Sequence, residues 1–127
     1  MNEKSLLTGV SLVAIVLVTI HQADDVVRGM SPGGLLNFVV IAFGGIWLYA
    51  TLMLVGRRAG YIIILAASLL GLVIPFVHMR GPGVGFGTTR SSGLLFVWTL
   101  LALGVTSLFS VILAVRGLWQ LRRRNSA

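Results

Sequence analysis

The sequence predicts an all-α, polytopic integral membrane protein whose four transmembrane helices form an antiparallel up-and-down bundle. The first observation is that four apolar runs, at residues 5–20, 35–55, 61–77 and 94–115, fill most of the 127-residue chain. The second is that 10% of the residues are charged and 57% are hydrophobic, whereas soluble domains contain about 25% charged residues. The third is that short polar breaks separate the runs, so consecutive helices must run antiparallel. We therefore expect one transmembrane domain over residues 1–127.

The first helix is expected at residues 5–28. Its apolar part from Leu6 covers about 22 Å at 1.5 Å per residue, which is shorter than a hydrocarbon core of roughly 30 Å. Continuing the helix through Arg28 completes the crossing, and Gly29 then ends it. A charged start followed by an apolar run also resembles a signal peptide. Residues 19–23 form a poor cleavage site, however, so we expect this helix to be retained.

The remaining helices are expected at residues 35–55, 61–79 and 93–119, each near the length of roughly 20 residues that a crossing requires. The second and third helices are joined by residues 56–60, a segment too short for anything except a tight antiparallel hairpin. Residues 120–127 are expected to form a basic cytoplasmic tail. Each half of the bundle is thus an αα hairpin.

The distribution of basic residues predicts the orientation. With four crossings, both termini and the loop between the second and third helices lie on one side. That side carries seven of the ten basic residues, namely Lys4, Arg57, Arg58, Arg116, Arg122, Arg123 and Arg124. Because short loops rich in lysine and arginine remain in the cytoplasm, we expect a multi-pass protein of the inner cell membrane with both termini cytoplasmic.

Polar and ionisable side chains gather at the opposite, outer rim. His21, Asp24, Asp25 and Arg28 are spaced at i, i+3, i+4 and i+7, so they share one stripe of the first helix about 100° wide. His78 ends the third helix on the same side of the membrane. The candidate ligand-binding residues are His21, Asp24, Asp25, Arg28, Asn37, His78, Arg80 and Arg90. Four of them carry metal-ligating groups, namely His21, Asp24, Asp25 and His78.

Three interpretations of this cluster follow from the sequence. A carboxylate at the centre of a bilayer costs about 2.5–3.5 kcal/mol and less towards the edge, so one that occurs there indicates function by default. Alternatively, Asp24 and Asp25 lie in a solvated loop that supports the charge asymmetry. In the third interpretation the charges form an ion-pair lock between helices.

The two halves of the chain resemble each other in outline. Each has an apolar helix, a histidine, an Arg-Gly, a Pro-Gly and a Gly-Leu-Leu that opens the next helix, and His21 and His78 stand 57 positions apart (78 − 21). If the halves are repeats, they are related by an axis along the membrane normal. His21 and His78 would then face each other across the bundle. Chance resemblance between apolar helices is the alternative.

Composition excludes several classes of function. The net charge of +7 comes from basic residues at helix ends and not from one exposed face, so no nucleic-acid partner is expected. The chain contains no cysteine, which excludes disulfides, thiolate metal sites and cysteine nucleophiles. No complete catalytic constellation is present, and whether the protein is an enzyme stays open.

Three functional hypotheses remain. The first is a non-catalytic membrane module, an accessory subunit or a lipid- or partner-binding protein that contacts the bilayer and a protein partner or a second copy. The second is a protein that binds a divalent metal or a haem, or an enzyme acting on a lipid-soluble substrate at the outer face, with His21 and His78 as ligands. The third is a small oligomeric transporter. The cofactor is not identified by the sequence, and metal and haem both stay open.

Overall fold

Four long apolar helices form an antiparallel bundle in the computed structural model, as the sequence predicts. The structure describes residues 2–27, 29, 33–78, 93–124 and 126. The helices are α1 (Glu3–Val27), α2 (Leu35–Met53), α3 (Arg58–His78) and α4 (Gly93–Arg124). Each is long and apolar enough to cross a membrane. By helix length and hydropathy the chain is a multi-pass membrane protein that contacts the lipid bilayer.

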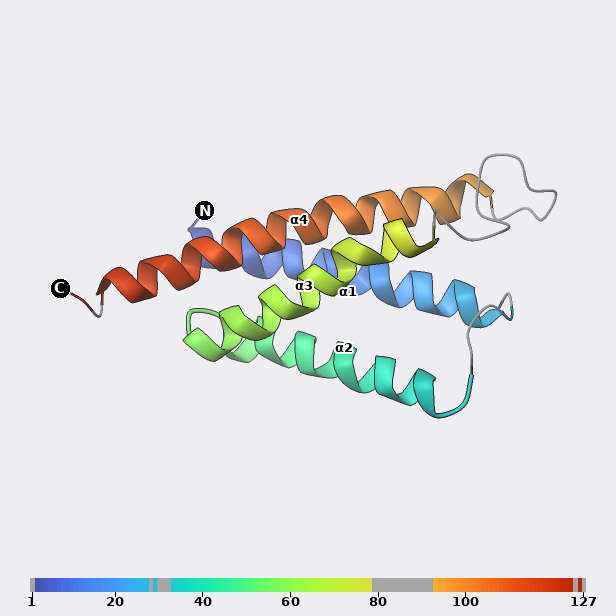
Figure 1. Cartoon of the computed structure of the whole chain (residues 1–127), viewed down its shortest axis with the longest axis horizontal. Coiled ribbons are helices and arrows are strands. Elements are labelled where there is room, and N and C mark those ends of the chain that lie inside the picture. Colours follow the sequence, from blue (N-terminus) through green and yellow to red (C-terminus); the bar gives the residue numbers. More distant parts are fainter. Residues whose placement is uncertain (1, 28, 30–32, 79–92, 125, 127) are drawn as a thin grey trace.

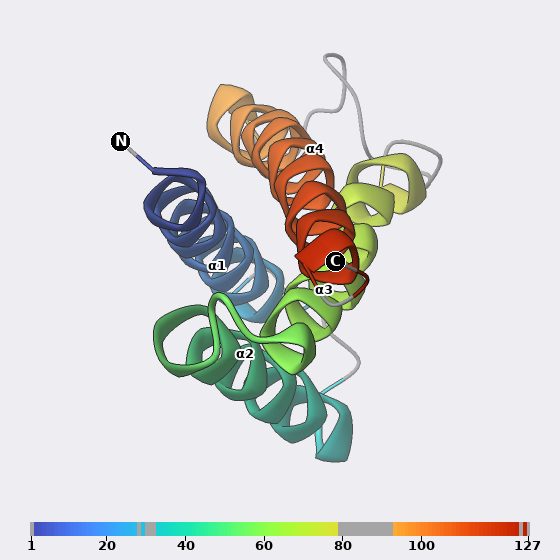
Figure 2. The same ribbon diagram turned by 90° about the vertical axis from the view of Figure 1, so that its left-hand side faces the viewer.

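The bundle has two distinct ends. The start of α1, the turn between α2 and α3, and the end of α4 lie together at one end, which we call the terminal end (Figure 1). The end of α1 and the end of α3 lie at the other, which we call the histidine end. Viewed along the bundle, α4 lies beside both α1 and α3, while α2 lies on the far side from α4 (Figure 2).

The helices do not pack equally. Helix α4 makes extensive contacts with α3 and α1, whereas α2 contacts its neighbours less and α1 touches α3 only narrowly. A two-hairpin repeat makes α2 the counterpart of α4, and these two helices pack very differently. The bundle therefore departs from repeat symmetry even though both halves are helical hairpins.

Helix α4 is longer than the sequence suggests, because it ends at Arg124 and not near residue 119. Residues 120–124 are one glutamine, one leucine and three arginines, which favour helix. Arginines in the last turn also interact favourably with the helix dipole. Glu3 of α1 fixes this part of the helix, since its carboxylate accepts hydrogen bonds from Arg116 and Gln120, each at 2.6 Å.

The turn between α2 and α3 depends on two glycines. Gly56 has a φ of +91°, a conformation that side chains rarely adopt. Gly60 lies directly against the backbone carbonyl of Leu54, and a Cβ atom there would collide with that carbonyl oxygen. The Arg57 N–H donates to the same carbonyl at 2.9 Å. The two backbones can approach this closely only because residue 60 has no side chain.

A buried polar network links α1 to α2 in the membrane interior. The indole N–H of Trp47 donates to Ser11 Oγ at 2.8 Å, and Ser11 is also hydrogen-bonded to Thr51 Oγ1 at 2.8 Å. Thr51 Oγ1 in turn donates to the Trp47 carbonyl at 2.9 Å. All three residues are at most 1% exposed. Because α2 otherwise packs loosely, this network is a principal link between α2 and α1.

Replacing Ser11 with alanine should weaken the α1–α2 hairpin. The change removes both hydrogen bonds of the Ser11 hydroxyl and leaves the Trp47 N–H unpaired in an apolar interior, at a cost of about 1–2 kcal/mol. Thr106→Ala is the matched control, since that hydroxyl bonds only carbonyls of its own helix, Ala102 at 2.8 Å and Leu103 at 3.1 Å. Reversible unfolding in detergent should separate the two variants. Equal losses would contradict a linking role for Ser11.

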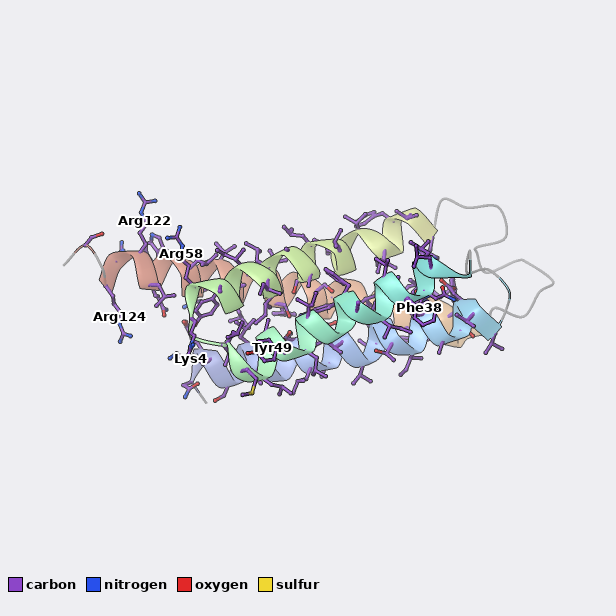
Figure 3. All side chains as sticks on the ribbon, turned by 90° about the horizontal axis from the view of Figure 1, so that it is seen from below. Lys4, Phe38, Tyr49, Arg58, Arg122 and Arg124 are labelled. Atoms are coloured by element: carbon purple, nitrogen blue, oxygen red, sulfur yellow. The ribbon has the colours of Figure 1, made fainter. Side chains whose placement is uncertain are left out.

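Apolar side chains cover the outer surface of the bundle. On α2 they include two aromatic residues, Phe38 and Tyr49, which are 69% and 57% exposed (Figure 3). Similar exposure recurs on every helix, as at Val16, Phe76 and Phe109. Exposing this apolar surface to water would be unfavourable in free energy, whereas in a bilayer the surface faces hydrocarbon.

Candidate metal centre

Three ionisable side chains converge at the histidine end. His21 and Asp25 are one helical turn apart on α1, and His78 is the last residue of α3. Asp25 Oδ2 lies 3.4 Å from His21 Nε2 and 3.4 Å from His78 Nε2. The three donor atoms lie within 4.8 Å of one another. His21 is 3% exposed and Asp25 is 8% exposed, whereas the His78 side chain is 25% exposed, so the cluster is mostly buried and is most open at His78.

The position of the cluster along α1 places it at the edge of the membrane. Asp25 lies 22 residues beyond Glu3 (25 − 3), which is about 33 Å at 1.5 Å per residue. A hydrocarbon core is roughly 30 Å thick. With Glu3 at one boundary, the cluster lies at the opposite boundary, which reduces the cost of burying a carboxylate.

The ring of His78 is oriented by a backbone hydrogen bond. His78 Nδ1 lies 3.0 Å from the Ile74 carbonyl oxygen one turn earlier. A carbonyl oxygen can only accept, so Nδ1 carries the proton of this bond. In the neutral ring Nε2 then presents a lone pair towards Asp25. Metal-ligating histidines are commonly oriented in this way, by donating the other ring N–H to a carbonyl or carboxylate.

His21 is buried without a hydrogen bond. Among the residues that the structure describes, neither ring nitrogen of His21 has a hydrogen-bond partner, and neither does Asp25 Oδ1. Buried polar atoms are nearly always paired, so each exception requires an explanation. A ligand bound between His21, Asp25 and His78 would supply the missing partner.

Helix α4 closes the cluster on one side with an aromatic ring. The ring centroids of His21 and His78 are 4.6 Å apart, and the rings meet edge to face. Phe96 lies beside both, at 5.4 Å from His21 and 6.2 Å from His78. This apolar ring lowers the local dielectric on its side of the cluster, which strengthens electrostatic attraction to a cation.

Two of the three separations between donor atoms fit a first-row metal ion, and the third is within 4.8 Å. With bonds of about 2.0–2.1 Å to nitrogen and oxygen, two ligands of a tetrahedral ion lie about 3.3–3.4 Å apart. Both distances between Asp25 Oδ2 and the imidazole nitrogens are 3.4 Å. Two imidazoles and a carboxylate supply three ligands, and such sets leave a coordination position open for water or another ligand.

The other candidate residues lie outside this group of three. Asp24 is half-buried on α1 beside Asp25, but it is not a member of the converging set. Asn37 lies half-buried in the first turn of α2. The remaining candidates, Arg28, Arg80 and Arg90, are outside the described residues.

Two further features support the cluster, and the first of them could not be predicted from the sequence. One is the Phe96 wall, which comes from α4 and has no distinguishing sequence context. The other is Pro75, buried one turn before His78 and packed near Gly104, where an added Cβ atom would lie 3.2 Å from Pro75 Cγ. A proline has no N–H to donate, so the Gly71 carbonyl lacks its usual helical partner.

Comparisons with protein-family models, with curated proteins and with solved structures found no match to this chain. Interpretation of the cluster therefore depends on its own geometry and chemistry.

Proposed function

We propose that this protein is a membrane-spanning metal-binding module. One divalent first-row transition-metal ion is held by His21, Asp25 and His78, and it ties α1 to α3. The supporting observation is the convergence of two imidazoles and a carboxylate in a buried site where His21 has no hydrogen-bond partner among the described residues. This proposal develops the second of the three hypotheses from the sequence, with the outer polar cluster as the metal site.

The distances favour a metal over a lock made by ion pairs alone. If either histidine were protonated and bonded to Asp25, a charge-assisted hydrogen bond of about 2.7–2.9 Å would be expected. The N···O distances are 3.4 Å for both His21 and His78. A neutral His78 would instead direct a lone pair at the carboxylate, which is repulsive. A cation between the three groups removes this repulsion.

The same geometry favours a metal ion over a haem. For bis-histidine ligation the porphyrin plane must lie between the two imidazoles. The rings of His21 and His78 are in edge contact, with centroids 4.6 Å apart, and Asp25 approaches both of them. This arrangement leaves no space between the two imidazole rings for a porphyrin.

The donor set defines the class of ion. Imidazole nitrogen suits zinc, copper, iron and nickel, while the absence of cysteine from the chain excludes thiolate-dependent sites. Two imidazoles and one carboxylate match the ligand types of zinc sites with an open fourth position and of non-haem iron(II) sites. Zinc is the appropriate first probe, and cobalt(II) reports tetrahedral geometry by its visible absorption.

Neighbouring acids on α1 provide a matched test. Metal-free protein in detergent should bind one Zn²⁺ or Co²⁺ per chain in calorimetric and absorbance titrations. Asp25→Asn should lower the affinity at least about 100-fold, because losing even an outer-shell partner costs about 10–100-fold. Asp24→Asn makes the same chemical change outside the group of three and should bind like the wild type. Unchanged metal binding by Asp25→Asn would overturn the proposal. Loss of metal binding in Asp24→Asn alone would overturn it as well.

A further inference from the structure

A pocket lies at the terminal end, remote from the histidines. An open pocket of about 750 Å³ lies between the α2–α3 turn and the end of α4. Arg57 and Arg58 line it from the turn, and Arg122 lines it from α4. In the stick view, Arg58 and Arg122 project from the same side of the bundle (Figure 3). The pocket therefore brings together basic groups that lie far apart in the sequence.

The pocket changes from basic to apolar towards the membrane. Ile62 follows Arg58 by one turn of α3, and Leu118 precedes Arg122 by one turn of α4. Since α3 starts at this end and α4 finishes there, both apolar residues lie deeper than the arginines, by about 6 Å along the helix. Trp119 also lines the pocket. This order matches the junction between the headgroup and the acyl chains of a lipid.

The arginines of the pocket lack an internal counter-charge. The chain contains three acidic residues, Glu3, Asp24 and Asp25, and the two aspartates are at the other end. Glu3 is already bonded to Arg116 and Gln120. Within the part of the chain that the structure describes, no carboxylate pairs with the pocket arginines. Among the described residues, their charge is therefore available to an anion from outside the protein.

We infer that this pocket binds the headgroup phosphate of an anionic phospholipid. Arginine guanidinium groups hold phosphate oxygens through paired, charge-assisted hydrogen bonds. Basic pockets between transmembrane helices recognise anionic headgroups in this way. Trp119 is 54% exposed, and the Arg123 guanidinium lies 3.7 Å from its ring centroid. A tryptophan at this depth lies against the glycerol region of the lipid.

The apolar wall distinguishes a lipid from other anions. Ile62 is 48% exposed on the outer surface of α3, so the lower part of the pocket is open to the hydrocarbon layer. An acidic peptide or a free phosphate has no apolar chain to occupy that part. A lipid occupies both parts at once, with its phosphate at the arginines and its first methylenes against Ile62 and Leu118.

Two charge-matched variants test this inference. Arg58→Gln with Arg122→Gln removes two positive charges from the pocket, whereas Lys4→Gln with Arg124→Gln removes two from the opposite side of the same end (Figure 3). Both double variants remove two positive charges from the terminal end, so they change equally the charge asymmetry that directs membrane orientation. Native mass spectrometry from micelles containing phosphatidylglycerol and phosphatidylcholine would count the retained lipids. The wild type and the Lys4/Arg124 variant should retain phosphatidylglycerol, and the Arg58/Arg122 variant should lose about tenfold in retention.

Three results would overturn the inference. Equal losses in both variants would indicate diffuse attraction to an anionic surface and no built site. Equal retention of both lipids by the wild type would exclude headgroup recognition. Displacement of phosphatidylglycerol by inorganic phosphate at equal concentration would assign a soluble anion to the pocket. All measurements use metal-free protein, so the outcome is independent of the metal proposal.

Discussion

Adding Zn²⁺ to the metal-free protein is expected to raise its midpoint of thermal unfolding by about 10 °C. A ligand that binds only the folded state at about 100 times its Kd contributes about 2.7 kcal/mol, and for a domain of this size each kcal/mol raises Tm by roughly 3–6 °C. His78→Gln removes one ligand and should abolish most of the shift. Differential scanning fluorimetry or circular dichroism in detergent, with and without chelator, provides the measurement.

The expected effect is large because of where the ion would bind. Helices α1 and α3 touch only narrowly, and much of their packing runs through α4. His21 and Asp25 belong to α1 and His78 belongs to α3, so the ion would join two helices that share little direct contact. An undiminished shift in His78→Gln would contradict this cross-linking role.

The second large effect is expected from Gly60→Ala. The added methyl group collides with the Leu54 carbonyl oxygen, and neither backbone can move away within so short a turn. Overpacking of this kind typically costs about 1–3 kcal/mol, and we expect a loss near the upper end. Equilibrium unfolding in mixed detergent micelles would measure it.

Gly44→Ala on α2 is the matched control for Gly60→Ala. A Cβ atom at Gly44 meets nothing within 4 Å. Because alanine is the better helix former by about 1 kcal/mol, this variant should be neutral or slightly more stable. If the two alanine variants behaved alike, the close contact at the α2–α3 turn would not be a determinant of stability.

The fold was predictable because length and apolarity decide whether a segment crosses a membrane. Those same properties say little about where a helix stops once it leaves the lipid. Residues 120–124 were expected in a tail, yet they continue α4, since Glu3 pairs with Arg116 and Gln120 across more than a hundred residues of sequence. Such pairing depends on which helices become neighbours, and the hydropathy pattern does not specify that.

The candidate site was predictable in part. The i, i+4 spacing of His21 and Asp25, together with His78 at the end of the third helix, predicted that the three proposed ligands lie at one end of the bundle. The pattern could not separate Asp24 from Asp25, because both lie within a stripe about 100° wide. Only the rotation of α1 against α3 and α4 decides which carboxylate faces inward, and packing sets that rotation. The Phe96 wall was not predictable for the same reason.

Pro75 has a consequence for how quickly an ion could come and go. Because the Gly71 carbonyl lacks its helical partner, the final turn of α3 is joined to the rest of that helix by one hydrogen bond fewer. His78 is carried on this turn, whereas His21 and Asp25 are carried on an uninterrupted part of α1. The site therefore combines two side chains on a rigid helix with a third on a more flexible helical turn. The donor atoms are up to 4.8 Å apart, so they must move closer together to bind an ion. The last turn of α3 would make this movement, and its stiffness would set the residence time of the ion.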